Sequence, residues 1–278
     1  MTRFASVFFF ATLALVGAGC QLLGHDADAP DPVAAAIERA STDPHRSEQN
    51  IARNAYRHPA ETLGFFGFEP SMAVLEVQPG AGIWYTEILA PLLAENGRYV
   101  AASYDLTNPE LSEYAKRAHE ALVARFREQP ERYGDLDLAV IHPPEIHLGA
   151  DESLDLVLNF RNTHGQIRSG AAEEIYAAFF AVLKPGGVLG VVQHRAGPET
   201  DTSKFNGYVP EETVIALAEG AGFVFDAKSE INANPNDRAN YARGVWTLPP
   251  SLTLGDEDRE KYLAIGESDR MTLRFRKP

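Results

Sequence analysis

Apolar and polar stretches alternate along most of the chain in a way that predicts an α/β fold. Short apolar runs typical of buried strands lie at 72–77, 98–103, 136–141, 154–160 and 187–194. Segments with helical spacing of apolar positions lie at 86–96, 109–129, 170–183 and 210–220. Further strands are predicted at 223–231 and 271–277, the last with the alternation of an edge or antiparallel strand. Strands that alternate with helices predict a mostly parallel, seven-stranded sheet with helices on both faces.

The first twenty residues depart from this pattern. Arg3 precedes an apolar stretch at 4–17, which is too short to span a bilayer comfortably, and small residues then lead to Cys20, the only cysteine. We therefore predict a signal peptide over 1–19 that resembles a lipoprotein signal, with Cys20 as the lipidated residue. An uncleaved anchor, or a simple signal peptide with a chance cysteine, is the alternative.

This signal predicts where the chain resides. We expect a protein of the cell envelope, in the periplasm or at the outer membrane, that touches the membrane only through the lipid anchor at Cys20. Residues 20–45 should form a polar tether and then a short helix, which begins at Asp31-Pro32 because proline is favoured at the first helical position. The folded domain should then span 46–278.

The net charge of the chain limits the classes of partner that it is expected to bind. The 278 residues include 25 Lys and Arg and 39 Asp and Glu, for a formal net charge of −14. Such an acidic surface argues against DNA, RNA or anionic lipid as a partner. The single cysteine excludes an internal disulfide.

A glycine-containing turn follows the first strand of the predicted sheet. The sequence LEVQPGAG places Glu76 near the end of the strand, and Gly80 and Gly82 in the turn that opens a helix. Glycine allows a ligand to approach the backbone closely, and a helix N-terminus offers unpaired N–H groups to a carboxylate. The turn therefore suits an amino-acid-like cofactor, although glycine turns follow strands in many α/β proteins without binding one.

Several segments together resemble the class I (Rossmann-like) S-adenosylmethionine (SAM)-dependent methyltransferases. Glu76 and the glycine turn are similar to the first motif of that class, except that Gln78 replaces its first glycine. LKPGG at 183–187 resembles the segment before the fifth strand. The segments FRNTH, QHRA, NPNDR and the closing SDRMTLRFRKP resemble predicted methyltransferases of bacterial envelopes with an FRNxH-type motif. The resemblance covers about 45–278 and implies SAM as cofactor and a small-molecule methyl acceptor.

The resemblance also indicates cofactor-binding residues. They are expected along the carboxyl ends of the first, second and fourth strands: Glu76, Gln78, Gly80, Gly82, Ser103, Asp105 and Asn159. In the class, an acidic residue ends the second strand and binds the ribose hydroxyls, whereas Ser103 occupies that place here. Because a carboxylate accepts both hydrogen bonds more strongly than a serine hydroxyl, either cofactor affinity is low or a shifted turn brings Asp105 to the ribose.

Three polar residues after the fourth predicted strand are the candidates for catalysis: Arg161, Asn162 and His164. They lie at the carboxyl end of the sheet, where ligands bind in this architecture. A neutral His164 could remove a proton from a hydroxyl, amine or thiol acceptor. Arg161 would hold an acidic group of the acceptor, and Asn162 would orient either partner. Alternatively, Arg161 and Asn162 bind loop backbone and His164 is an ordinary, partly buried histidine.

Other residues near strand ends carry weaker signals. His142, His147, His164 and His194 all follow predicted strands, but their spacing is not that of a metal site and none is predicted. Trp84 and Tyr85 come directly after the glycine turn, where aromatic residues contact a cofactor or, more often, belong to the core.

Two functions from different classes follow from these observations. One is an active methyltransferase for a small molecule, which Glu76, Gly80, Gly82 and the RNTH segment favour. The other is a catalytically silent envelope lipoprotein that uses the same fold as a binding or scaffold module. Export favours the second, because SAM is made in the cytosol. We expect the enzyme.

Overall fold

The computed structural model describes residues 1–2 and 31–278, of which Asp31–Pro278 form one compact unit. The predicted signal peptide from residue 3 onward, and the predicted lipid anchor at Cys20, lie outside the described residues. Within the part of the chain that the structure describes, no helix combines the length and apolar character needed to cross a bilayer.

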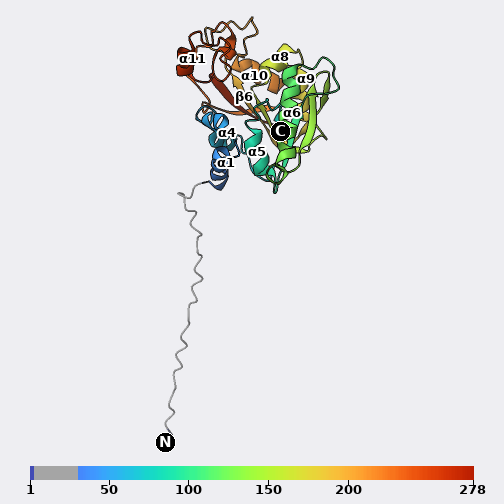
Figure 1. Cartoon of the computed structure of the whole chain (residues 1–278). Helices are drawn as coiled ribbons and strands as arrows, with labels where there is room; N and C mark the ends of the chain where they lie inside the picture. The colour runs from blue at the N-terminus through green and yellow to red at the C-terminus, as the bar shows by residue number, and fades with distance from the viewer. Residues whose placement is uncertain (3–30) are drawn as a thin grey trace. The chain divides into compact units, whose positions relative to one another are not determined.

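An eight-stranded sheet runs through this unit in the order β4-β3-β2-β1-β5-β6-β8-β7. Figure 1 labels its strand β6 among the helices. The strands are β1 (Ala73–Val77), β2 (Arg98–Ser103), β3 (Asp137–His142), β4 (Glu145–His147), β5 (Leu154–Phe160), β6 (Leu183–His194), β7 (Val224–Ser229) and β8 (Arg270–Arg276). β3, β2, β1, β5 and β6 pair in parallel, whereas β4 and β8 run antiparallel to their neighbours. The predicted α/β class and mostly parallel sheet are therefore confirmed.

The strand count differs from the predicted seven by β4, which lies between the strands predicted at 136–141 and 154–160. β4 has only three residues, two of them exposed, and it forms a tight hairpin with β3 at the edge of the sheet. Such a short strand leaves no periodic signal in the sequence. β8 was expected as an edge or antiparallel strand; it is antiparallel but lies between β6 and β7, so Met271, Leu273 and Phe275 are fully buried.

Helices occupy the connections between the strands. They are α1 (Pro32–Thr42), α2 (Glu48–Ala52), α3 (Asn54–Arg57), α4 (Pro59–Phe65), α5 (Thr86–Leu93), α6 (Glu113–Glu128), α7 (Pro130–Tyr133), α8 (Thr163–Arg168), α9 (Ala172–Val182), α10 (Glu211–Gly220) and α11 (Arg259–Ile265), with a 3₁₀ turn η1 (Gly244–Thr247). The four helices predicted from periodicity correspond to α5, α6, α9 and α10. The predicted start of α1 is also confirmed, because Asp31 Oδ1 accepts a hydrogen bond of 2.9 Å from the backbone of Val33.

Alternate residues of each strand face opposite sides of the sheet and form two apolar cores. On one face, Val74 and Leu156 are paired across β1 and β5 and pack with buried residues of α1, α4, α5 and α6. On the other face, Leu75 and Val157 are paired and pack with α9 and α10. This two-residue alternation places helices on both faces, as the sequence predicts.

Glu87, at the start of α5, connects the N-terminal helical segment to α6. Its side chain is only 1% exposed, and it accepts hydrogen bonds from Asn50 Nδ2 at 2.8 Å and Arg125 Nη1 at 2.5 Å. The Nε of Arg46 lies 3.5 Å from Oε2 of Glu87. Because a buried carboxylate requires such partners, these contacts fix the segment around α2 beside the turn that follows β1.

Candidate active site

A cavity of about 780 Å³ opens at the carboxyl ends of the parallel strands. Its walls include Gln78 after β1, Tyr104 after β2, His142 at the end of β3, Arg161 after β5 and His194 at the end of β6. Carboxyl ends of parallel strands share one edge of the sheet, so side chains from distant parts of the chain meet there. The volume lies in the range of small-molecule sites.

The glycine turn forms one wall of this cavity. Gln78, Gly80 and Gly82 all line it. A Cβ added at Gly82 would meet no other heavy atom within 4 Å, and one at Gly80 would meet only the Tyr114 hydroxyl, at 3.1 Å. The backbone of the turn is therefore open to a ligand. Asn50 Nδ2 donates to the carbonyl oxygen of Gly82 at 3.0 Å and thus holds the turn from the N-terminal side.

Glu76 lies beneath the turn and is not part of the cavity wall. Its carboxylate accepts hydrogen bonds from the Tyr99 hydroxyl at 2.7 Å and from Thr86 Oγ1 at 2.8 Å. Burial raises the pKa of Glu76 to about 7, although both hydrogen bonds oppose the rise. The acidic residue thus links β1, β2 and the start of α5, which fixes the turn that carries the two glycines.

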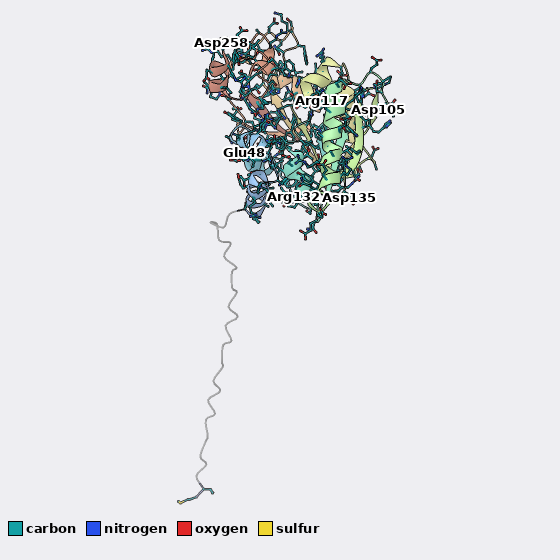
Figure 2. All side chains as sticks on the ribbon, viewed as in Figure 1. Glu48, Asp105, Arg117, Arg132, Asp135 and Asp258 are labelled. Carbon is teal, nitrogen blue, oxygen red and sulfur yellow. The ribbon has the colours of Figure 1, made fainter. Side chains whose placement is uncertain are left out.

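Neither candidate for binding a ribose reaches the cavity. Ser103 is buried, and its hydroxyl lies 2.9 Å from His119 Nδ1. Asp105 accepts hydrogen bonds from the backbone and side chain of Thr107 at 2.8 and 2.7 Å, and Figure 2 labels it at the periphery of the domain. Among the described residues, the only carboxylate that lines the cavity is Glu267.

Asn159 and Asn162 lie only three positions apart, near the end of β5, but only one of them lines the cavity. Asn159 is fully buried, outside the cavity wall, and donates to Thr163 Oγ1 and Gln166 Oε1 at 3.2 and 3.1 Å. It therefore fixes the start of α8. Asn162 lines the cavity, and its Nδ2 donates to the carbonyl oxygen of Val77 at 2.7 Å. This bond joins the loop after β5 to the end of β1.

His164 lies in the cavity wall in largely apolar surroundings. Its ring centroid is 5.9 Å from that of Trp246 and 5.7 Å from that of His194, and Gln193 Nε2 lies 3.3 Å from its Nδ1. Burial lowers the pKa of His164 to about 4, with a smaller contribution from the charge of Arg161. Burial also lowers the pKa of His194, whose Nδ1 is 2.6 Å from Ser268 Oγ. Both imidazoles are thus neutral near pH 7.

Arg161 lines the cavity from a left-handed backbone conformation, with φ of 62°. Its own N–H donates to the carbonyl oxygen of Val192 at 2.7 Å, which holds the loop. Its guanidinium, in contrast, makes no hydrogen bond or ion pair within residues 31–278. Burial lowers its pKa to about 10, so the side chain stays charged at neutral pH.

Sequence reasoning missed three charged residues of the cavity: Arg53, Arg57 and Glu267. Arg53 Nε lies 2.5 Å from one oxygen of Glu267, and Arg57 Nε lies 3.4 Å from the other. The arginines are four positions apart in a helical segment, but Glu267 lies more than 200 residues away, so no local pattern pairs them.

The NPNDR segment supports this carboxylate and does not enter the cavity. Asn234 Nδ2 donates to the carbonyl oxygens of Ile265 and Glu267, at 2.8 and 2.7 Å. Asp237 accepts from the backbone of Asp269 at 2.8 Å. The motif therefore has a structural role, since it fixes the chain on either side of Ser268.

The four histidines near strand ends do not come together as a set. His142, His164 and His194 line the cavity, whereas His147 is exposed on β4 and lies 2.9 Å from Glu145. In the described part of the chain, no three His, Cys, Asp or Glu side chains are grouped as metal ligands would be. Of the two aromatic residues after the turn, Trp84 lines the cavity, and Tyr85 stacks on Phe160 with centroids 3.7 Å apart.

Comparison with solved structures identifies the fold. A SAM-dependent methyltransferase from Aquifex aeolicus matches with a TM-score of 0.55 at 14% identity, over 88% of this chain and 98% of that one. The [4+2]-cyclase SpnF matches with 0.52 at 16%, over 81% and 82%. A SAM-dependent methyltransferase from Methanosarcina mazei matches with 0.50 at 13%, over 77% and 96%. No family model matches the chain, and no curated protein does.

These similarities extend over most of each chain but at low sequence identity, so they establish architecture and not chemistry. SpnF is a [4+2]-cyclase, which illustrates that this architecture carries more than one reaction. The chain has the Rossmann-like fold of class I SAM-dependent methyltransferases, with one additional short edge strand.

Proposed function

We propose that this protein transfers a methyl group from SAM to a small molecule in the cavity at the carboxyl ends of the strands. The observation that carries the proposal is the open glycine turn: Gly80 and Gly82 leave free space above their backbone, inside a cavity that five strands border. Structural neighbours with TM-scores of 0.50 or more include two SAM-dependent methyltransferases, which supports the assignment.

The residues present can hold most of the cofactor. The turn from Gln78 to Gly82 would receive its amino-acid part, and the aromatic side chains of Tyr104 and Tyr114 would pack against its adenosine. Among the described residues, no unpaired carboxylate faces the ribose: Asp105 lies outside the cavity wall, and Glu267, the one carboxylate in the wall, is paired with Arg53 and Arg57. We therefore expect weaker cofactor binding than a ribose-binding carboxylate would give.

Bound SAM would supply an electrophilic methyl group, and the protein would align the acceptor with it. Asn162 and His164 are our candidates for this role, since both line the cavity and Asn162 is bonded to the carbonyl oxygen of Val77, next to the glycine turn. A neutral acceptor oxygen becomes a strongly acidic oxonium as it gains the methyl group. Even a weak base such as His164, with its lowered pKa, can then accept the acceptor proton.

The alternative is a binding module with the same fold and no catalysis. The missing ribose carboxylate is the observation that favours it. A measurement of SAM affinity distinguishes the two functions, because a silent module that binds a different ligand is not expected to bind SAM.

Calorimetric titration of the full-length protein with SAM and with adenosylhomocysteine tests the proposal. We expect saturable binding of both, weakened at least about 10-fold in Gly82→Val, whose side chain would occupy the space above the turn. Gly64→Val is the matched control, because Gly64 is exposed on α4, away from the cavity, and its added Cβ also meets nothing within 4 Å. No binding by a folded sample, or equal affinity in Gly82→Val, would contradict the proposal.

We also propose that the chain is an envelope lipoprotein anchored through Cys20. Support comes from the position of the only cysteine directly after an apolar stretch and small residues. Metabolic labelling with a radioactive fatty acid tests this: label should enter the wild-type protein and be absent from Cys20→Ser. Equal labelling of both, or of neither, would contradict the anchor.

A further inference from the structure

Positive charge is concentrated in one wall of the cavity. Arg53, Arg57 and Arg161 line it, and Arg270 lies directly behind, with its Nη2 3.2 Å from Glu267 Oε2. Glu267 is the only carboxylate paired with these four guanidinium groups among the described residues. Against the effect of burial, the charges of Arg57, Arg270 and Arg53 lower the pKa of Glu267 to about 2, so it is ionised.

Much of the hydrogen-bonding capacity of this cluster is unused. Arg57 is 1% exposed, and neither of its terminal nitrogens, Nη1 and Nη2, has a partner among the described residues. Nη2 of Arg53 is also buried and unpaired. Arg161 is partly exposed to the cavity, and its guanidinium makes no hydrogen bond or ion pair within residues 31–278. Buried charged donors without acceptors are costly, which indicates a ligand that supplies acceptors and negative charge.

Two members of the cluster, Arg57 and Arg270, are held in place by the protein itself. The guanidinium carbon of Arg57 lies 4.7 Å from the ring centroid of Trp84, and Arg270 donates to the carbonyl oxygens of Ser268 and Tyr56 at 3.1 and 3.0 Å. A set of planar guanidinium groups matches the geometry of oxyanions, to which each can donate two hydrogen bonds.

A single carboxylate from a ligand would not balance the positive charge of these four arginines. The carboxylate of bound SAM carries one negative charge, whereas its sulfonium and ammonium groups are both positive. Glu76 also lies near Arg161 and Arg57, but burial keeps it largely protonated below pH 7. A positive cofactor next to four guanidinium groups therefore requires a further anion, and the acceptor is the molecule that can bring it.

We propose that Arg53, Arg57 and Arg161 form a subsite for a doubly charged oxyanion group of the methyl acceptor, such as a phosphate monoester or a pair of carboxylates. The inference rests on the proposed function in one respect: it takes the molecule that carries the anion to be the methyl acceptor. The anion subsite itself does not depend on cofactor binding. With a net charge of −14, the protein as a whole does not attract anions, so any affinity for an anion must come from a local site.

Calorimetric titration of the full-length protein with inorganic phosphate and with malonate, in about 150 mM chloride to screen weak surface effects, tests the subsite. We expect saturable binding of at least one of them, and the stronger of the two identifies the group as phosphate or dicarboxylate. Arg161→Asn should weaken it at least 10-fold, because asparagine accepts the left-handed backbone at this position while the charge is lost. Arg117→Gln, on the exposed surface of α6 (Figure 2), removes the same charge elsewhere and should leave the affinity unchanged.

A second titration, with adenosylhomocysteine present at saturation, distinguishes the acceptor from the cofactor. Undiminished anion affinity supports a subsite that serves the acceptor. Competition would show that the arginines hold the carboxylate of the cofactor, which overturns the inference while leaving the proposed function intact. Absence of binding by both anions, in wild-type protein with a native near-ultraviolet circular dichroism spectrum, also overturns it.

Discussion

Tyr99 donates its hydroxyl to the carboxylate of Glu76 across the β1–β2 pair, at 2.7 Å, in a site that water does not reach. The acidic residue of the glycine motif is therefore a buried support for the turn. Its role in the cavity is indirect, because it positions the backbone that a ligand would contact.

Glu76→Gln should change how stability depends on pH. Burial raises the pKa of Glu76 from 4.5 to about 7 in the folded protein, so the folded state binds more protons than the unfolded state between these values. The wild-type protein therefore loses stability as pH rises through this window, by up to ~3 kcal/mol, and glutamine removes that loss. Thermal unfolding followed by circular dichroism from pH 5 to 8 should shift in favour of Glu76→Gln as pH rises.

The control for this effect is Glu120→Gln, which removes a carboxylate from the exposed face of α6. Its melting temperature should follow that of the wild type across the same range. A constant difference between Glu76→Gln and wild type from pH 5 to 8 would show that Glu76 is already ionised in the fold, contrary to our account.

Glu87→Gln should destabilise the protein strongly. Arg46 has a fully buried side chain, and Glu87 is the carboxylate that faces it, at 3.5 Å. Loss of this charge leaves Arg46 buried without compensation, for which we expect about 3–5 kcal/mol of lost unfolding free energy. Urea unfolding measures this value. Glu113→Gln, which breaks the exposed pair with Lys116, should change stability little; equal effects of the two variants would contradict the role of Glu87.

His164→Ala should lower turnover by about 10²-fold while cofactor affinity stays near normal, because we propose this imidazole in the cavity wall as the base for the acceptor. With its pKa near 4, His164 stays neutral through the physiological range, so the wild-type rate should be level from pH 6 to 8 and fall only below about pH 5. Steady-state rates against pH measure both effects once an acceptor is found. The exposed His147→Ala serves as control, and a fully active His164→Ala would end the proposed role.

Asn162→Ala should weaken cofactor binding without unfolding the protein. Its side chain joins the loop after β5 to the carbonyl oxygen of Val77, at 2.7 Å, next to the glycine turn. Loss of a single, partly buried hydrogen bond costs about 1 kcal/mol, which corresponds to roughly a 5-fold change in affinity if the turn loses its alignment. Calorimetry with adenosylhomocysteine measures it; unchanged affinity would assign Asn162 to loop stability alone.

The fold was largely predictable from the sequence because its main elements carry local signals. α5, α6, α9 and α10 have helical periodicity, and β1, β2, β3, β5 and β6 contain apolar runs of a length typical of parallel sheets. β4 was missed because three residues at an edge carry no such pattern. The position of β8 between β6 and β7 is set by tertiary pairing, which alternation along one strand does not encode.

The site was only partly predictable, for a physical reason. Gln78, Gly80, Gly82, Arg161, Asn162 and His164 line the cavity because strand ends meet at one edge, which sequence can anticipate. Ser103 instead forms a hydrogen bond with His119, and Asn159 with Gln166. No local sequence pattern reveals these pairings. The arginine cluster depends on a contact between Arg53 and Glu267, 214 positions apart, and such contacts are set by the complete fold.

A crystal structure of the full-length protein grown with adenosylhomocysteine tests the central claim most directly. Our account predicts electron density for the ligand in the cavity, with its amino-acid part over the turn that contains Gly80 and Gly82. Density for the ligand elsewhere on the molecule, or an empty cavity at saturating ligand, would contradict the assignment of this cavity as a methyl-transfer site.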